Sequence, residues 1–300
     1  MPARSTRAHV VAGDWVAVDV ASDPPEVTAV LERRSALRRR VPGGATADQV
    51  LAANVDLVLV VHGLDRPIVP GRLDRSLVLA WESGAVPAVV LTKADLVAEP
   101  AEALDEVGAV APGVDVVATS ATTGLGLEEV SRWLAPHRTA VLLGASGVGK
   151  SSLVNRLVGT DLQAVRSVRA ADGKGRHTTT TRDLVPLPGG GVLLDTPGLR
   201  ALGLWGEGEG LSRTFADVED LAGSCRFRDC RHAGEPGCAV QAAVDDGRLD
   251  PGRLERFRRL ERELTHLELR LDEQARRARD RRVARLYREI KRERRHRPRS

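Results

Sequence analysis

The sequence of 300 residues has few of the features that mark secreted or membrane proteins. Its three cysteines lie in one short segment (225–238), and three cysteines cannot form a disulfide framework, so metal binding is the better interpretation. No apolar run approaches the roughly 18 residues that a membrane span needs, and the first residues lack the charged-then-apolar pattern of a signal peptide. We therefore expect a cytoplasmic protein of two or three domains that binds no membrane.

Lysine is also scarce in this chain. Only four of the 45 basic residues are lysines, namely Lys93, Lys150, Lys174 and Lys291. A chain that uses arginine almost everywhere has reason to keep lysine where a compact, flexible ammonium group is needed. Lys93 and Lys150 fall in motifs described below, whereas Lys291 fits a chance survivor of the arginine bias.

Charge is distributed unevenly along the chain. Residues 251–300 contain 19 basic and 9 acidic residues, a net charge of +10, whereas the first 250 residues contain 26 basic and 32 acidic residues, a net charge of −6. A basic C-terminal arm on a mildly acidic body indicates a polyanionic partner such as nucleic acid. A solvated helix whose charges form salt bridges is the alternative interpretation.

A glycine-rich segment joins an apolar run (141–143) to a helix-like stretch (153–157). Its pattern, GxxxxGK[ST], is that of the phosphate-binding loop, in which glycines let successive amide groups turn toward phosphate oxygens. Lys150 would place a positive charge at the β- and γ-phosphates, and the Ser151 hydroxyl would hold Mg²⁺. We expect a nucleotide to bind at Gly144, Ala145, Ser146, Gly147, Val148, Gly149, Lys150, Ser151 and Ser152.

Short apolar runs predict the strands of an α/β domain. Helix-like segments, such as 72–81 and 127–134, separate several of these runs, which favours a mostly parallel sheet. The runs typical of buried strands cover residues 55–61, 86–91, 114–117, 141–143 and 191–194.

The regions on either side of this domain have other patterns. β-like pieces at 15–20 and 27–31 predict a small β-module, and after Cys238 the chain is helical. One apolar stripe on the last helix, which we expect to pack on the body of the chain, comprises Phe257, Leu260, Leu264, Leu267 and Leu271. We divide the chain into a β-module (1–45), a nucleotide-binding domain (46–212) and a metal-binding, mainly helical domain with a basic arm (213–300).

A second phosphate-side motif, Asp195-Thr196-Pro197-Gly198, follows the apolar residues 192–194. Its carboxylate would stand at the end of a strand, where Asp195 can reach Mg²⁺ through water and the Gly198 amide can face a γ-phosphate. A DxPG tetrapeptide is a common turn when seen alone. After a buried strand and downstream of a phosphate loop, we interpret it as functional.

A base-recognition motif, Thr92-Lys93-Ala94-Asp95, closes another predicted strand and resembles the [NT]KxD motif of GTPases. Asp95 can accept hydrogen bonds from the N1 hydrogen and exocyclic amine of guanine, whereas adenine presents a lone pair there. Lys93 can lie over the base with its ammonium toward the phosphate loop, and Ser120-Ala121 can supply an amide to the base oxygen. These residues favour a GTPase over a phosphate-loop kinase or ATPase.

The order of these motifs is unusual. Most GTPases begin with the phosphate loop, but here the base motifs at 92–95 and 120–121 precede the phosphate loop at 144. The sequence therefore predicts a circularly permuted GTPase domain. This arrangement resembles the circularly permuted GTPases, and the remaining segments resemble the RsgA (YjeQ) family of ribosome small-subunit-dependent GTPases.

A switch segment, 175–180, resembles the G-x-H-T-T segment of that family. The resemblance implies that Thr179 closes on Mg²⁺ and the γ-phosphate, with Thr180 as the alternative. Leu199 stands where Ras-like enzymes place the glutamine that orients the attacking water, and an aliphatic side chain cannot do so. The resemblance assigns this task to His177, and we expect poor intrinsic hydrolysis.

The cysteines form the pattern Cys225-x4-Cys230-x-His232-x5-Cys238. Three thiolates and one imidazole make a closed tetrahedral set for one structural Zn²⁺, with no position left for water. The spacing is similar to that of the RsgA zinc subdomain, and three unrelated buried cysteines is the alternative. Chelation is expected to unfold this region and to spare much of the GTPase core.

The resemblance implies a function for the whole chain. It predicts a monomeric GTP hydrolase that uses Mg²⁺ with GTP, binds the small ribosomal subunit and its rRNA, and assists a late step of its maturation. The alternative is a zinc-containing RNA-binding protein with a regulatory, weakly hydrolysing nucleotide site. The family's N-terminal OB-fold has five strands, and this chain begins near the later half (Gly13-Asp14-Trp15), so we expect a short or truncated module.

Overall fold

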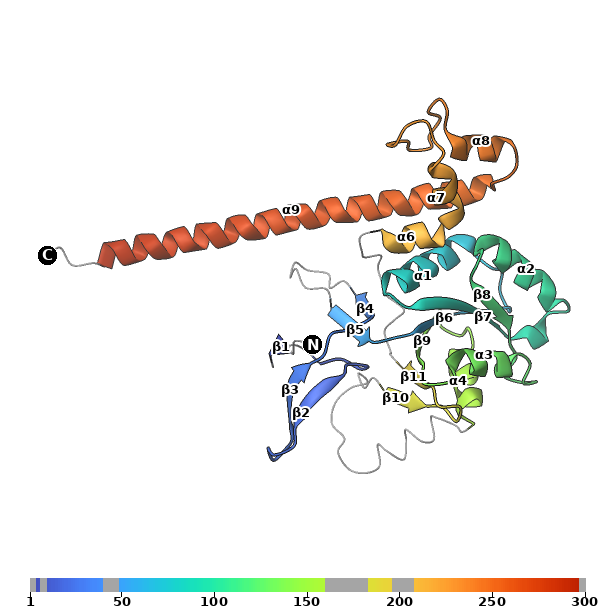
Figure 1. Cartoon of the computed structure of the whole chain (residues 1–300), viewed down its shortest axis with the longest axis horizontal. Coiled ribbons are helices and arrows are strands. Elements are labelled where there is room, and N and C mark those ends of the chain that lie inside the picture. The colour runs from blue at the N-terminus through green and yellow to red at the C-terminus, as the bar shows by residue number, and fades with distance from the viewer. Residues whose placement is uncertain (1–3, 6–9, 40–48, 160–182, 196–207, 297–300) are drawn as a thin grey trace.

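The computed structural model of the chain describes residues 4–5, 10–39, 49–159, 183–195 and 208–296 (Figure 1). The strands are β1 (Arg4–Ser5), β2 (Val16–Asp19), β3 (Glu26–Val30), β4 (Ala36–Arg39), β5 (Gln49–Ala53), β6 (Leu57–Gly63), β7 (Val86–Thr92), β8 (Asp115–Ala118), β9 (Thr139–Leu143), β10 (Asp183–Pro186) and β11 (Val192–Asp195). The helices are α1 (Pro70–Glu82), the 3₁₀ turn η1 (Ala94–Leu96), α2 (Pro100–Val110), α3 (Leu127–Leu134), α4 (Lys150–Val158), α6 (Glu209–Thr214), α7 (Ala216–Ala222), α8 (Ala239–Asp245) and α9 (Pro251–His296).

The central sheet has the strand order β10-β11-β9-β6-β7-β8. Its neighbouring strands are parallel except β10 and β11, which are antiparallel. β6 and β7 are interior strands of this sheet and are buried on both faces, which explains their continuous apolar runs. The predicted α/β class with a mostly parallel sheet is confirmed, and β10 is a strand that the apolar runs did not predict.

Helices cover both faces of the sheet (Figure 1). On one face α1 and α2 pack over Val58 and Val60, in a cluster that includes Leu77. On the other face α3 and α4 pack over Leu59, in a cluster that includes Leu153. Successive residues of β6 alternate between the two clusters because side chains alternate between the faces of a strand.

The N-terminal part of the chain forms two small antiparallel groups of strands. One is a sheet in the order β1-β3-β2, and the other is the pair β4 and β5, so that β5 continues the β-structure past residue 45. Gly13 (φ 90°) packs against β5 so closely that an added Cβ would lie 2.0 Å from the Ala53 oxygen. Asp14 beside it binds Arg33 (Oδ1 to Nε, 2.6 Å). These contacts are compatible with the predicted OB-like module.

The C-terminal helices pack on the α1 side of the sheet. α6 lies along α1, and the residues Phe257, Leu260 and Leu264 of α9 are buried in the same apolar cluster as α1 and α2. Leu267 packs against the edge of that cluster, and the Leu271 side chain lies outside the described ones. The described part of the predicted stripe therefore packs on the body of the chain, and the rest of α9 extends away from it (Figure 1). Among the described residues, no helix is both long and apolar enough to cross a membrane.

A buried ion-pair network joins the start of α9 to α1. The Arg253 guanidinium binds Asp74 (Nη1 to Oδ1, 3.3 Å) and Asp217 (Nε to Oδ2, 2.9 Å), and it donates to two backbone carbonyl oxygens at 2.6 and 2.7 Å. Arg253 is 2% exposed and Asp74 is fully buried. Burial raises the pKa of the Asp74 carboxyl, while Arg256 (Nε to Oδ2, 2.8 Å) and Arg253 act in the opposite direction. Buried ion pairs, as well as apolar packing, thus hold the C-terminal helices against the nucleotide-binding fold.

Candidate guanine-nucleotide site and metal centre

The glycine-rich loop lies between β9 and α4, at the carboxyl edge of the parallel strands. Gly147 and Gly149 have positive φ angles of 76° and 93°, and a Cβ on Gly144 would lie 2.4 Å from the Val61 oxygen. The loop conformation therefore depends on glycine. The Lys150 ammonium reaches back to the carbonyl oxygens of Gly144 (2.7 Å) and Ala145 (2.5 Å), so it lies inside the loop where phosphates would bind. Ser151 and Ser152 are exposed in the first turn of α4.

The end of β7 is hydrogen-bonded to this loop. The Thr92 hydroxyl hydrogen-bonds to the Val148 oxygen and lies 3.2 Å from the His62 oxygen at the end of β6. A Cβ on Gly149 would lie 3.2 Å from the same hydroxyl, and the φ of Gly149 is 93°, so the position favours glycine. The first residue of the base motif thus contacts the phosphate loop 56 residues further along the chain.

Lys93 also joins the base motif to the phosphate loop. Its backbone is left-handed (φ 63°), and its ammonium donates to the Gly147 oxygen and to the Asp65 carboxylate, both at 2.8 Å. Arg66 binds the same carboxylate at 3.1 and 3.3 Å. Hydrogen bonds from Arg66 and then Lys93 hold the pKa of Asp65 well below its usual range. We did not predict Asp65 or Arg66 as site residues, although both follow a buried parallel strand at the carboxyl edge, where ligands bind in such sheets.

Asp95 and Ser120 lie in contact at the ends of β7 and β8. The Ser120 hydroxyl donates to Asp95 Oδ1 at 2.5 Å and accepts the amides of Thr122 and Thr123 at 3.2 and 3.1 Å. The Ser120 amide donates to the Leu125 oxygen at 3.1 Å, so it is already hydrogen-bonded within the chain. The other carboxylate oxygen of Asp95, Oδ2, takes no part in this hydrogen bond.

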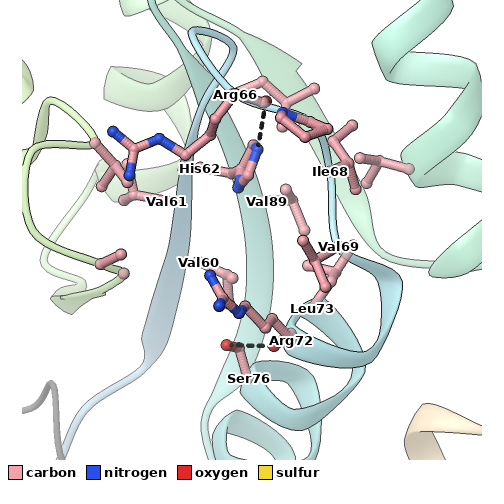
Figure 2. Close-up of a pocket in the computed structure, with 16 residues that line it drawn as sticks. Val60, Val61, His62, Arg66, Ile68, Val69, Arg72, Leu73, Ser76 and Val89 are labelled. Atoms are coloured by element: carbon pink, nitrogen blue, oxygen red, sulfur yellow. Dashed lines mark hydrogen bonds between the residues drawn. The ribbon is translucent and has the colours of Figure 1, made fainter. Parts of the chain in front are cut away.

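A cavity of about 260 Å³ lies beside the phosphate loop, between β6 and α1 (Figure 2). Its wall is mainly apolar, with Arg66, Arg72 and His62 among its polar residues, and the His62 Nε2 atom lies 3.2 Å from the Arg66 oxygen. Lys93, Asp95 and Lys150 do not line it. Gly144, Ala145 and Val148 of the phosphate loop do line it, so the cavity borders the predicted phosphate site on the side away from the base motif.

Several predicted residues fall outside the described part of the chain. These are His177, Thr179, its alternative Thr180, and Gly198; of Asp195 only the backbone is described. β11 ends at Asp195 and pairs in parallel with β9, with Leu194 opposite Val141. The DxPG motif therefore begins at the same sheet edge as the phosphate loop.

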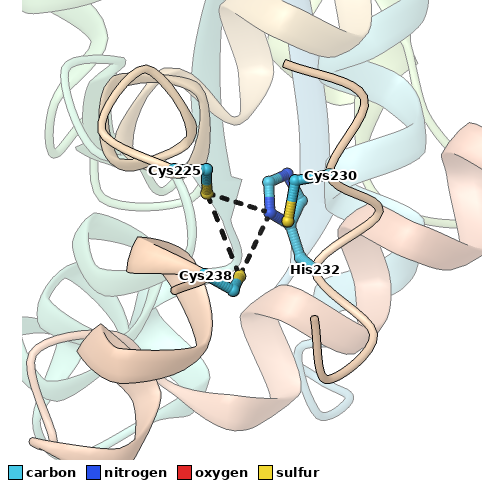
Figure 3. Close-up of side chains that lie close together, drawn as sticks. All are labelled: Cys225, Cys230, His232 and Cys238. Carbon is cyan, nitrogen blue, oxygen red and sulfur yellow. Dashed lines mark hydrogen bonds between the residues drawn. The ribbon is translucent and has the colours of Figure 1, made fainter. Parts of the chain in front are cut away.

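The four predicted metal ligands are brought together (Figure 3). The ligand atoms of Cys225, Cys230, His232 and Cys238 all lie within 4.8 Å of one another. His232 Nδ1 lies 3.6 Å from Cys225 Sγ and 3.5 Å from Cys238 Sγ, and these two sulfurs are 3.9 Å apart. A tetrahedral ion with Zn–S bonds of about 2.3 Å and Zn–N bonds of about 2.0 Å separates two sulfurs by about 3.8 Å and sulfur from nitrogen by about 3.5 Å. The donor set and its spacing fit zinc.

Backbone amides and one carboxylate surround the sulfur atoms. Ala239 donates its amide to Cys225 Sγ at 3.3 Å, and burial of this thiol is outweighed by such amide hydrogen bonds, so that its pKa is lowered. Burial raises the pKa of the Cys230 thiol to about 11. The Glu235 carboxylate accepts the amides of residues 231 and 233 (3.1 and 2.7 Å), which closes the loop that carries Cys230 and His232. A bound divalent cation would favour the thiolate form of all three cysteines.

A phosphate loop on a parallel sheet, preceded in the chain by base-recognition elements at the same edge, defines a circularly permuted phosphate-loop GTPase. The family model described as RsgA GTPase matches residues 30–205. This chain belongs to the RsgA GTPase family, and it is a GTP-hydrolysing enzyme.

Relatives and solved structures agree with this assignment. Proteins named small ribosomal subunit biogenesis GTPase RsgA are similar: that of Streptomyces avermitilis is 51% identical (85% of this chain, 69% of the relative), and that of Opitutus terrae is 45% identical (94% and 80%). The crystal structure of YjeQ from Thermotoga maritima is 30% identical with a TM-score of 0.64, covering 86% of this chain and 85% of that one. YloQ, titled a circularly permuted GTPase, is 27% identical with a TM-score of 0.64 (88% and 83%). The predicted family and permutation are confirmed.

Proposed function

We propose that this cytoplasmic, monomeric GTPase binds the small ribosomal subunit and assists a late step of its maturation, with GTP hydrolysis stimulated by the subunit. The proposal rests on the meeting of Lys93, Asp95 and the phosphate loop at one sheet edge, in permuted order, in a chain whose relatives are named for small-subunit biogenesis. The basic residues of 251–300 and the β-module would contact rRNA, mainly through its phosphates.

The nucleotide-binding roles follow the motifs. Guanine would be recognised by Asp95 and by the amide of the Ser120-Ala121 pair, with Lys93 over the base and Thr92 and Ala94 supporting them. The phosphates would lie against residues 144–152. Asp195 and Gly198 would contribute from the γ-phosphate side.

Hydrolysis would depend on charge neutralisation and on an oriented water. Lys150 would neutralise charge that develops on the transferred phosphoryl group, and Ser151 and Thr179 would hold Mg²⁺, which supplies further electrostatic stabilisation when bound. His177 would orient the water. The zinc ion would be structural, held by Cys225, Cys230, His232 and Cys238.

The first test is GTP turnover with purified ribosomal subunits. We expect slow hydrolysis by the protein alone and a rate that rises when small subunits are added, but not with large subunits. His177→Ala is expected to bind GTP normally and to lose the stimulated rate, because its hydrogen-bonding ring would orient the water. A rate that does not respond to small subunits would contradict the proposed function, and full stimulation of the His177→Ala protein would remove that residue from the mechanism.

The second test is a change of base preference at Asp95. The Ser120 hydroxyl accepts two amides and donates to the carboxylate, so in Asp95→Asn it would hold the amide oxygen and leave the NH₂ group toward the base. That group matches the C2 oxygen of xanthine and opposes the amine of guanine. We expect GTP affinity to fall roughly 100-fold or more and XTP to become the preferred nucleotide. Asp105→Asn, on the exposed side of α2, is the matched control; continued preference for GTP in Asp95→Asn would refute the base assignment.

A further inference from the structure

The turn at the end of β6 leaves room for the Asp65 carboxylate and fixes its position. The Leu64 amide donates to the Thr92 oxygen at 2.9 Å, which fixes this turn to the end of β7. A Cβ on Gly63 would lie 2.5 Å from Asp65 Oδ1, so the absence of a side chain there makes room for the carboxylate. The Arg66 oxygen lies 3.2 Å from the His62 ring (Figure 2). The turn therefore has a defined conformation that directs Asp65 toward the phosphate loop.

Asp65 is one of two acceptors that fix the Lys93 ammonium. Lysine has a flexible four-carbon stem and loses about 2 kcal/mol of rotamer entropy when it is held in one position. Here the ammonium is clamped between Asp65 Oδ2 and the Gly147 oxygen, at 2.8 Å from each, although the side chain is 29% exposed. Before any nucleotide binds, the Lys93 stem is thus already held in the position from which, in the proposed site, it would lie over the guanine base.

Arg66 completes the arrangement. Its guanidinium contacts both oxygens of the Asp65 carboxylate, so the carboxylate is shared by two cations. The cluster of three charged groups has a net positive charge next to a site for a polyanion. Asp65 can therefore order Lys93 without making the rim of the site repel phosphates.

We propose that Asp65 is a positioning residue for guanine nucleotides: it acts through Lys93, which it holds on the phosphate loop ready to cover the base. This inference rests on the proposed nucleotide-binding role of Lys93 and assigns a role to a residue outside the nucleotide motifs. Because Asp65 acts through the Lys93 ammonium, its removal is expected to weaken the binding of GDP and GTP alike and to leave the chemical step unchanged.

The test measures the affinity of the full-length protein for a fluorescent GDP analogue and the kinetics of GTP hydrolysis. Asp65→Ala is expected to weaken GDP binding about twofold to fivefold, the range of a partly exposed ion pair, and to raise KM with kcat unchanged. Asp65→Glu keeps the charge and is expected to restore most of the affinity. Asp246→Ala removes an exposed carboxylate paired with Arg248 (3.3 Å) far from the site and is expected to change nothing.

A double-mutant cycle separates action through Lys93 from a general structural effect. Asp65→Ala combined with Lys93→Met should bind GDP no more weakly than Lys93→Met alone. Additive losses, or an Asp65→Ala protein that binds GDP as the unmodified protein does, would overturn the inference while the nucleotide site stands. If Lys93→Met itself leaves GDP affinity unchanged, the proposed nucleotide site is wrong, and the inference falls with it.

Discussion

Replacement of Asp74 by alanine is expected to lower the free energy of unfolding by about 3 to 5 kcal/mol. Asp74 is fully buried and contacts the guanidinium groups of Arg253 and Arg256. Arg253 is 2% exposed, so it cannot turn to water when this partner is lost. Asp217 on α7 still pairs with Arg253 on α9, but the buried Arg253 guanidinium then has lost its carboxylate partner on α1. The loss should therefore loosen the attachment of the C-terminal helices as well as destabilise the chain.

A neighbouring ion pair between the same two helices is the matched control. Arg75 on α1 binds Glu263 on α9 at 2.7 and 2.8 Å, but the two side chains are 37% and 40% exposed. Arg75→Ala is expected to cost less than about 1 kcal/mol, because exposed pairs contribute little. Urea denaturation followed by circular dichroism gives both values. Equal losses in the two variants would show that burial of Asp74 does not decide the outcome.

The sheet could be predicted from the sequence because its strands are buried on both faces. The continuous apolar runs of β6 and β7 are typical of parallel strands between two layers of helices, and their ends were predicted to within two residues. β10 was missed because it is short, contains Asp183 and Pro186, and pairs only at the edge with β11. Tertiary pairing, rather than a local apolar pattern, accounts for this strand.

The candidate site could be predicted where a motif fixes both residue type and position. The meeting of Asp95 with Ser120, 25 residues away, follows from the parallel order of β7 and β8, whose carboxyl ends share one edge. Asp65 belongs to no motif, and its role depends on a contact with Lys93 across 28 residues. In an arginine-rich segment, Arg253 looks like a solvated residue, and only packing against α1 shows that it is buried.

Removal of zinc is expected to have the largest effect on the C-terminal half of the fold. Structural zinc sites supply binding free energy on the order of 10 kcal/mol that is coupled to folding. His232 is 7% exposed and its ring lies 6.4 Å from that of Phe257, which in turn contacts Phe215 at 5.5 Å in the α1-side cluster. Chelation should therefore expose amides in 225–238, in the first turns of α9 and in α1. The α3 and α4 side of the sheet should keep its protection, because its cluster contains none of these residues.

Hydrogen exchange with and without a chelator tests this prediction, and one variant of Cys238 makes the test specific to the metal. Cys238 is also the N-cap of α8, where its sulfur accepts the Gln241 amide at 3.3 Å. Cys238→Ser keeps a capping acceptor but removes a thiolate, so it should lose zinc and reproduce the exchange pattern of the chelated protein. Ser224→Ala, an exposed neighbour, should retain one zinc ion per chain. The prediction is wrong if the Cys238→Ser protein keeps its zinc and the α9 amides stay protected from exchange. In that case the four-residue metal centre does not stabilise α9 through the contact between His232 and Phe257.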